Sequence, residues 1–231
     1  MQPTAVAGHT ILTLHLGEIL PRSYLARTEL ALVDPFVYPG SGTSVAGVGW
    51  YETICLAALV RAASPGTIFE FGTLDGRTTL QLAANAPDAT VYTLELPPGS
   101  WERLPGMSED EREVAALARA GDYFRDTRYA ERIVQLWGNS TEFDFSEFAR
   151  AVDFVFVDAS KDPGYFERDA ENALRICSDR GVVVWHDYDN HGLFPEFDAF
   201  LRTLAETEEM VKVADTTLLV RMPRSGWRME E

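Results

Sequence analysis

Short apolar runs alternate with longer amphipathic runs along most of the chain. Each short run has five to seven residues rich in β-branched and aromatic side chains, which is typical of buried strands. Strands are predicted at 67–71, 90–96, 132–137, 152–158, 181–187, 210–215 and 216–222. The longer runs carry apolar residues at helical spacing, and several begin with capping residues. Helices are predicted over 50–63, 76–86, 108–120, 144–151, 162–177 and 195–206, and a turn is predicted at 179–181.

The order of these elements predicts the fold class. Strands that alternate with helices form a parallel sheet with right-handed crossovers. The last two predicted strands, 210–215 and 216–222, are almost contiguous, and a parallel pair would need a long connection. We therefore expect an α/β fold, with a doubly wound, mostly parallel sheet of seven strands and a C-terminal antiparallel hairpin. In such sheets the ligand lies outside the carboxyl ends of the strands.

The first 48 residues do not follow this alternation. They contain Pro3, Pro21, Pro35 and Pro39, and they end in the Gly/Ser-rich run PGSGTSVAGVG, which is typical of a loop. We predict an N-terminal extension or lid at 1–48 and one main domain at 49–231.

The charge excludes two kinds of partner. With 20 Lys+Arg against 36 Asp+Glu the formal net charge is −16, which would repel a nucleic acid or an anionic membrane. Cys55 and Cys177 lie in apolar runs and predict buried thiols rather than a disulfide framework. The N-terminus lacks the basic region of a signal peptide. A cytoplasmic protein is expected, and a homo-oligomer is left open.

The turn after the strand at 67–71 is the first candidate site. Gly72 allows a tight turn, and Gly76 allows close backbone approach at the start of a helix. The run matches neither G-x-G-x-x-G nor G-x-x-x-x-G-K-[ST], which disfavours a dinucleotide and a nucleoside triphosphate. Glu95 ends the next strand and could accept the ribose hydroxyls of an adenosine. The alternative is an ordinary βα turn with a solvated glutamate.

The fourth and fifth strand ends carry a second candidate site. Asp158 and Asp187 end neighbouring predicted strands, so their carboxylates could share a divalent cation, Mg²⁺ or Ca²⁺. A third ligand is left open among His186, Asp189 and water. Lys161 offers a competing solution, because its ammonium could neutralise the pair. The two aspartates could also merely shape the substrate cleft, and His186 could be a general base.

Two longer runs carry a family resemblance. FEFGTLDGRTTLQLAANAPDATVYTLELPP resembles the first two motifs of class I S-adenosylmethionine-dependent methyltransferases. VDFVFVDASKDPGYFERDAENAL, followed by GVVVWHDYDNHG, resembles the fourth and fifth strand regions of their small-molecule O-methyltransferase branch. The resemblance covers about residues 50–222. It implies a Rossmann-like fold, S-adenosylmethionine as cofactor, and methyl transfer to a hydroxyl of a small molecule.

The resemblance also implies roles for single residues. The implied cofactor contacts are Glu70, Gly72, Thr73, Gly76, Glu95, Asn139, Ser140 and Asp158. Leu74 stands where many members have a further glycine.

In the catechol and caffeoyl-CoA O-methyltransferases, the pattern D-x-x-K supplies a metal aspartate and a nearby lysine, which match Asp158 and Lys161. Their Asp-Asn pair matches Asp187, but Tyr188 replaces the asparagine. Sugar-modifying relatives use two acidic ligands in succession, and His186-Asp187 matches half of that pattern. Lys161 or His186 would then remove the acceptor's proton.

Two other functions are weighed against methyl transfer. A regulatory module that binds the cofactor without turnover is disfavoured by the polar set at Asp158, Lys161 and Asp187. An NAD-dependent oxidoreductase is disfavoured by the missing G-x-G-x-x-G motif and by the terminal hairpin.

Overall fold

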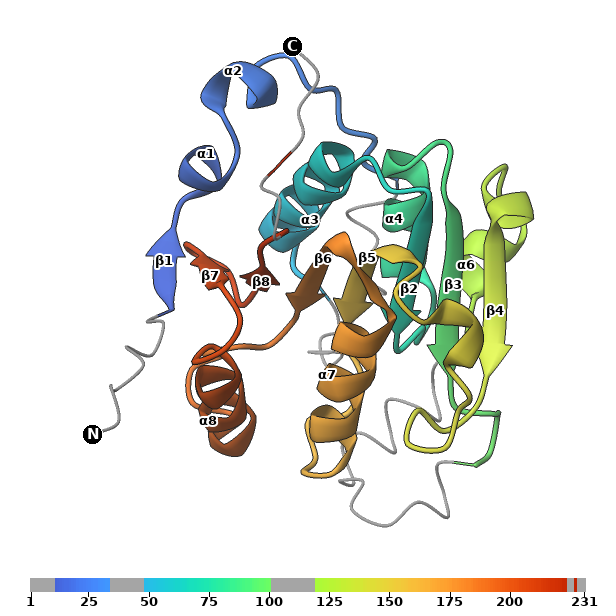
Figure 1. Cartoon of the computed structure of the whole chain (residues 1–231). Coiled ribbons are helices and arrows are strands. Elements are labelled where there is room, and N and C mark those ends of the chain that lie inside the picture. Colours follow the sequence, from blue (N-terminus) through green and yellow to red (C-terminus); the bar gives the residue numbers. More distant parts are fainter. Residues whose placement is uncertain (1–10, 34–47, 101–118, 224–226, 228–231) are drawn as a thin grey trace, which may run out of the picture.

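The computed structural model describes residues 11–33, 48–100, 119–223 and 227. Within these residues, eight strands form one sheet in the order β1-β7-β8-β6-β5-β2-β3-β4 (Figure 1). Their bounds are β1 Leu12–Leu14, β2 Thr67–Phe71, β3 Thr90–Glu95, β4 Ile133–Trp137, β5 Val152–Val157, β6 Cys177–Trp185, β7 Met210–Val213 and β8 Leu219–Arg221. β8 runs antiparallel to its neighbours β6 and β7, whereas the other pairs are parallel. The predicted fold class, with its C-terminal hairpin, is confirmed.

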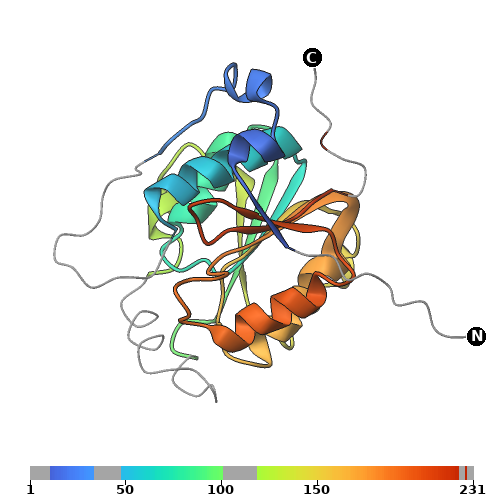
Figure 2. The same cartoon turned by 90° about the vertical axis from the view of Figure 1, so that its left-hand side faces the viewer.

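Helices cover both faces of the sheet. Their bounds are α1 Leu16–Ile19, α2 Arg22–Leu25, α3 Trp50–Ala63, α4 Arg77–Asn85, α6 Asp122–Arg125, α7 Tyr165–Ile176 and α8 Pro195–Leu204. α3 and α4 lie on one face, and α7 and α8 lie on the other (Figure 2). β5 shows why both faces are covered, because Phe154 and Phe156 pack under one helical layer while Val155 and Val157 pack under the other. Because both faces of such a central parallel strand are buried, its sequence is a nearly continuous apolar run.

The eighth strand comes from the N-terminal segment. β1 pairs in parallel with β7 at the edge of the sheet, and the Ala214 N–H donates to the Leu14 carbonyl at 2.8 Å. Further along, the Ala31 backbone exchanges two hydrogen bonds with the side chain of Asn85 on α4. Only three residues pair in β1, which is too short a run to carry a strand signal in the sequence. The role of 1–48 as a lid stays a prediction.

Three element boundaries differ from expectation. The residues at 179–181, expected to form a turn, lie inside β6. A Cβ on Gly181 would lie 2.5 Å from Cys177 Sγ and 2.8 Å from the Val152 carbonyl, so this glycine serves close packing at a register shift between β5 and β6. The predicted helix at 144–151 is a 3-10 turn at Ser146–Phe148, and α7 begins at Tyr165 rather than at 162. The predicted helix at 108–120 lies almost entirely outside the described residues.

Two further expectations concern the interior and the membrane. Cys55 and Cys177 are buried free thiols, as predicted. Among the described residues, none of the helices has the length and apolar character needed to cross a membrane.

Candidate active site

The turn between β2 and α4 depends on glycine for close packing. Gly72 has a φ of +89°, and a Cβ there would lie 2.3 Å from the Asp158 carbonyl oxygen. Gly76 also has a φ of +89°, and a Cβ there would lie 2.6 Å from the ring of Phe124 on α6. The carboxyl end of β2 is thereby brought against the carboxyl end of β5. Leu74 adopts a φ of +49°, a conformation that favours glycine, so the departure from the family motif falls at a strained position.

Glu95, at the end of β3, binds the backbone of this turn through its carboxylate. Its Oε2 accepts hydrogen bonds from the Thr73 N–H at 3.0 Å and the Leu74 N–H at 2.8 Å, and its Oε1 accepts from the Leu96 N–H at 2.9 Å. Burial raises the pKa of Glu95, although these three backbone donors act in the opposite direction. The predicted ribose acceptor is therefore also the group that fixes the shape of the glycine turn.

Glu70 lies deeper in the sheet, below the same turn. Its side chain is fully buried, and its Oε2 accepts from the hydroxyls of Thr79 on α4 and Thr93 on β3. Thr93 in turn pairs with the hydroxyl of Thr73 at 2.7 Å. Burial raises the pKa of Glu70 to about 8. Its Oε1 lacks a hydrogen-bond partner in the described part of the chain, so a buried polar atom is left for a ligand to satisfy.

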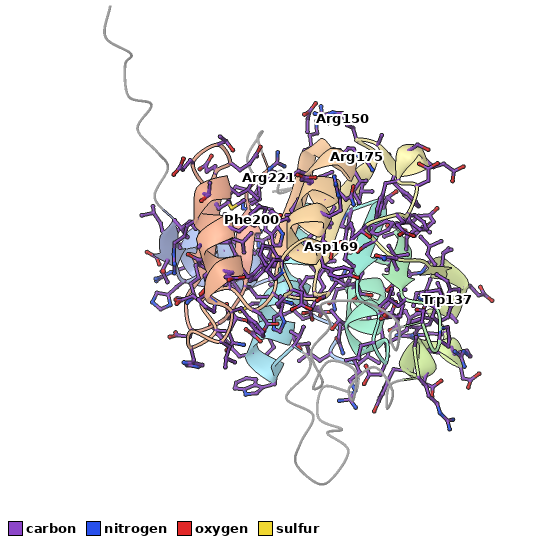
Figure 3. All side chains as sticks on the ribbon, turned by 90° about the horizontal axis from the view of Figure 1, so that it is seen from below. Trp137, Arg150, Asp169, Arg175, Phe200 and Arg221 are labelled. Carbon is purple, nitrogen blue, oxygen red and sulfur yellow. The ribbon has the colours of Figure 1, made fainter. Side chains whose placement is uncertain are left out.

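The loop after β4 carries Asn139 and Ser140. The Asn139 carboxamide oxygen accepts from the Thr141 N–H at 3.0 Å, and Asn172 on α7 donates to the Ser140 carbonyl at 3.1 Å. Asp169 lies on the same helix (Figure 3). It is buried and also hydrogen-bonds Ser140, and its burial raises its pKa to about 6. Polar groups of α7 thus hold this loop at the carboxyl end of β4.

Asp158, Lys161, His186 and Asp187 form one cluster at the ends of β5 and β6. The Lys161 ammonium lies 3.3 Å from Asp158 Oδ1 and 3.1 Å from Asp187 Oδ2. His186 Nδ1 lies 3.0 Å and 3.5 Å from the same two oxygens. The candidate ligand atoms of Asp158, His186 and Asp187 all lie within 4.8 Å of one another, which suits a single cation. The structure therefore brings together all four residues predicted at these strand ends.

The charges in this cluster shift one another's pKa values. Burial alone would lower the pKa values of Lys161 and His186, but the adjacent carboxylates raise both, and that of His186 lies well above its usual range. Burial alone would raise the pKa values of Asp158 and Asp187, but the two basic side chains lower both. In this arrangement Lys161 and His186 are cations at neutral pH, and neither can accept a proton until the charge around it changes.

Asp189, the alternative ligand predicted from the sequence, and its neighbour Tyr188 both lie outside the cluster. Asp189 pairs with Lys212 at 2.6 Å, and its side chain is 52% exposed. Tyr188, which replaces the asparagine of the catechol pattern, is buried in the core and cannot supply a carboxamide oxygen. Among the candidates for a third ligand from the chain, the structure therefore brings His186, and not Asp189, to the pair of aspartates.

Sequence reasoning missed Glu52, on the first turn of α3. Its Oε2 lies 3.2 Å from His186 Nε2, on the far side of the ring from the aspartates. Burial would raise its pKa, but His186 and the donors of Thr217 lower it to about 2. A glutamate three residues after Gly49 is a capping pattern, which gives a signal for a helix start but none for a contact across 134 residues.

Comparisons with known proteins agree with this arrangement. A family model described as a methyltransferase domain matches residues 69–188. Among curated proteins, the "Probable O-methyltransferase Rv1703c" of Mycobacterium tuberculosis is 31% identical over 136 residues, which cover 57% of this chain and 52% of that protein. The chain thus spans about half the length of the curated relative it matches.

Two solved structures share the fold. The O-methyltransferase TomG from Streptomyces achromogenes, in complex with S-adenosylmethionine, is 20% identical, with a TM-score of 0.55 and coverage of 77% of this chain and 81% of that one. An O-methyltransferase from Bacillus cereus, in complex with S-adenosylhomocysteine, is 21% identical, with a TM-score of 0.52 and coverage of 76% and 81%. At these identities the two structures support the fold alone.

Proposed function

From the premise that this chain belongs to the methyltransferase domain family, we propose that it transfers a methyl group from S-adenosylmethionine to a hydroxyl of a small molecule. The observation that carries the proposal is the contact between the glycine turn after β2 and the charged cluster that begins at Asp158. Gly72 brings the turn expected to hold the cofactor directly against the backbone of Asp158, where the charged cluster begins. Methyl transfer is an in-line displacement, and its rate depends on holding donor and acceptor together.

The residues of the turn fit the proposed cofactor. Glu70 offers an unsatisfied buried carboxyl oxygen, and Glu95 ends the neighbouring strand with its carboxylate at the turn. The residues proposed to hold the cofactor are Glu70, Gly72, Thr73, Gly76, Glu95, Asn139, Ser140 and Asp158. S-adenosylmethionine would supply the electrophilic methyl group. The chain's own residues would orient it and keep its adenosine on the side of β3 and β4.

The acceptor hydroxyl must lose a proton, and this requirement supports a cation at Asp158 and Asp187. Lys161 and His186 already hold protons against these carboxylates, as their raised pKa values show. A bound Mg²⁺ or Ca²⁺ would lower the pKa of the acceptor hydroxyl. Asp158 and Asp187 would hold the ion. Its positive charge would lower the pKa values of Lys161 and His186, so that one of them would first release its own proton to solvent and could then take the proton of the acceptor hydroxyl.

Calorimetry and turnover test the proposal in sequence. We expect S-adenosylmethionine and S-adenosylhomocysteine to bind the full chain, and methylated product to form from at least one member of a panel of phenols, sugars and other alcohols. Binding without turnover of any acceptor would favour the regulatory module. Failure of both cofactor forms to bind would overturn the proposal.

Removal of metal tests the cation separately. Once an acceptor is known, exhaustive chelation should abolish methyl transfer while calorimetry still detects cofactor binding, and Asp187→Asn should weaken Mg²⁺ binding. Full activity after chelation would contradict the metal. It would leave Lys161 as the counter-charge, in which case Lys161→Met should lower the stability of the chain.

A further inference from the structure

Glu52 joins three parts of the fold through one carboxylate. Its Oε1 accepts from the N–H of Thr217 at 2.6 Å and from the Thr217 hydroxyl at 2.7 Å, in the connection between β7 and β8. Its Oε2 accepts from the Gly49 N–H at 3.0 Å and lies 3.2 Å from His186 Nε2. A carboxylate has about four acceptor positions. All of them are used here, so the side chain is held in one place.

His186 receives this contact on one nitrogen and faces the acidic pair with the other. Its side chain is only 6% exposed, and Nδ1 lies 3.0 Å from Asp158 Oδ1. The imidazole is rigid, so a contact that fixes Nε2 also fixes the direction of Nδ1. A ring flip would exchange the nitrogen and carbon positions and break the contacts on both sides.

A role in helix capping alone does not account for these contacts. Glu18 makes the same capping contact at the start of α1, where its Oε2 accepts from the His15 N–H at 2.8 Å, and it does so at an exposed position. The capping contact of Glu52 uses only Oε2 and Gly49. The contacts to Thr217 and His186 are additional, and they join segments that are far apart in the sequence.

We infer that Glu52 is a positioning residue, which holds the His186 ring so that Nδ1 faces Asp158 and Asp187. The inference rests on the proposed function, because it assigns Glu52 a part in the same site. It also accounts for His186, rather than Asp189, as the third candidate ligand beside Asp158 and Asp187. Where a histidine ligates a metal, removal of the carboxylate that orients it typically costs about 10–100-fold in metal affinity or activity.

Imidazole ¹⁵N spectroscopy of the full chain tests the inference without cofactor or acceptor. The chain has four histidines, and His186→Gln would identify the signals of His186. In the native protein we expect the Nε2–H of His186 to exchange more slowly with water than those of His15 and His191. Glu52→Gln, which replaces the charged acceptor with a neutral amide, should weaken this protection and shift both ring nitrogens. Glu18→Gln, which removes only a capping contact, should leave the His186 signals unchanged.

Kinetics supply the second measurement once an acceptor is known. Glu52→Gln should lower kcat about 10-fold or more. It should leave cofactor affinity unchanged, because Glu52 contacts Gly49, His186 and Thr217 and not the turn between β2 and α4. Unchanged His186 signals in Glu52→Gln, with only a lower melting temperature, would show that the role is structural and would overturn the inference. If Glu52→Gln does not fold, rapid exchange of the native His186 Nε2–H would overturn it equally. Absence of methyl transfer would defeat the proposed function but leave the ring signals as evidence on Glu52.

Discussion

Glu95 offers the sharpest test of how the cofactor turn is built. Its carboxylate accepts three backbone N–H groups at 2.8–3.0 Å, two of them from the turn itself. In Glu95→Gln, the best amide orientation keeps the oxygen on Thr73 and Leu74 and places an NH₂ group against the Leu96 N–H. One hydrogen bond to a charged group is then lost, which costs about 1.5–3 kcal/mol. Glu95→Ala leaves all three donors without this acceptor and should cost more, although water can reach the half-buried site and reduce the sum.

Urea denaturation measures the free energy of unfolding of both variants, and calorimetry measures the affinity for S-adenosylmethionine. Stability and affinity should fall together, in the order native, Glu95→Gln, Glu95→Ala, at an unchanged denaturant slope. Glu131→Gln, at an exposed glutamate, is the matched control and should change neither quantity. The reasoning is refuted if Glu95→Ala is as stable as Glu131→Gln and binds the cofactor as tightly as the native chain.

Three further predictions concern the same edge of the sheet. Gly72→Ala should destabilise the chain far more than Gly99→Ala in urea denaturation, because both positions have positive φ but only Gly72 would place its Cβ 2.3 Å from a carbonyl oxygen; equal losses would contradict this. Because the pKa of Glu70 is raised to about 8, its burial favours the protonated form, and native stability should fall as pH rises from about 4.5 to 8. Glu70→Gln should remove this part of the pH dependence. If the free energy of unfolding changes with pH equally in the native protein and in Glu70→Gln, Glu70 is not the source of the change. In a thermal-shift assay S-adenosylhomocysteine should stabilise the chain and NAD should not; a shift with NAD alone would reverse that ranking.

Much of the fold and part of the site follow from local pattern. The alternation of apolar runs with helices predicts the parallel sheet, and the short connection between β7 and β8 predicts the hairpin. The convergence of Gly72, Asp158 and His186 follows because the carboxyl ends of parallel strands meet at one edge. These inferences succeed because each depends on residues close together in sequence, or on a rule that holds for the whole fold class.

The contacts that were not predicted depend on packing between distant segments. Glu52 meets His186 only because α3 packs beside the end of β6 and the turn that contains Thr217. Gly181 marks close packing against Cys177 rather than a turn, and only the register of β5 and β6 reveals this. β1 pairs over three residues at the sheet edge, which is too short for a periodic pattern to show.

Two acidic residues on adjacent strands show how the same residue class acquires opposite properties. Glu70 on β2 and Asp158 after β5 both lie near the carboxyl edge of the sheet. Among the described residues, the hydrogen-bond donors to the buried carboxyl of Glu70 are the hydroxyls of Thr79 and Thr93, so burial dominates and raises its pKa to about 8. Asp158 has Lys161 and His186 within 3.3 Å, and their charges outweigh burial and lower its pKa. At neutral pH Glu70 is therefore a neutral group able to donate a hydrogen bond, whereas Asp158 is an anion able to bind a cation. The sequence places both acids correctly, but their charge is decided by neighbours that only the folded chain supplies.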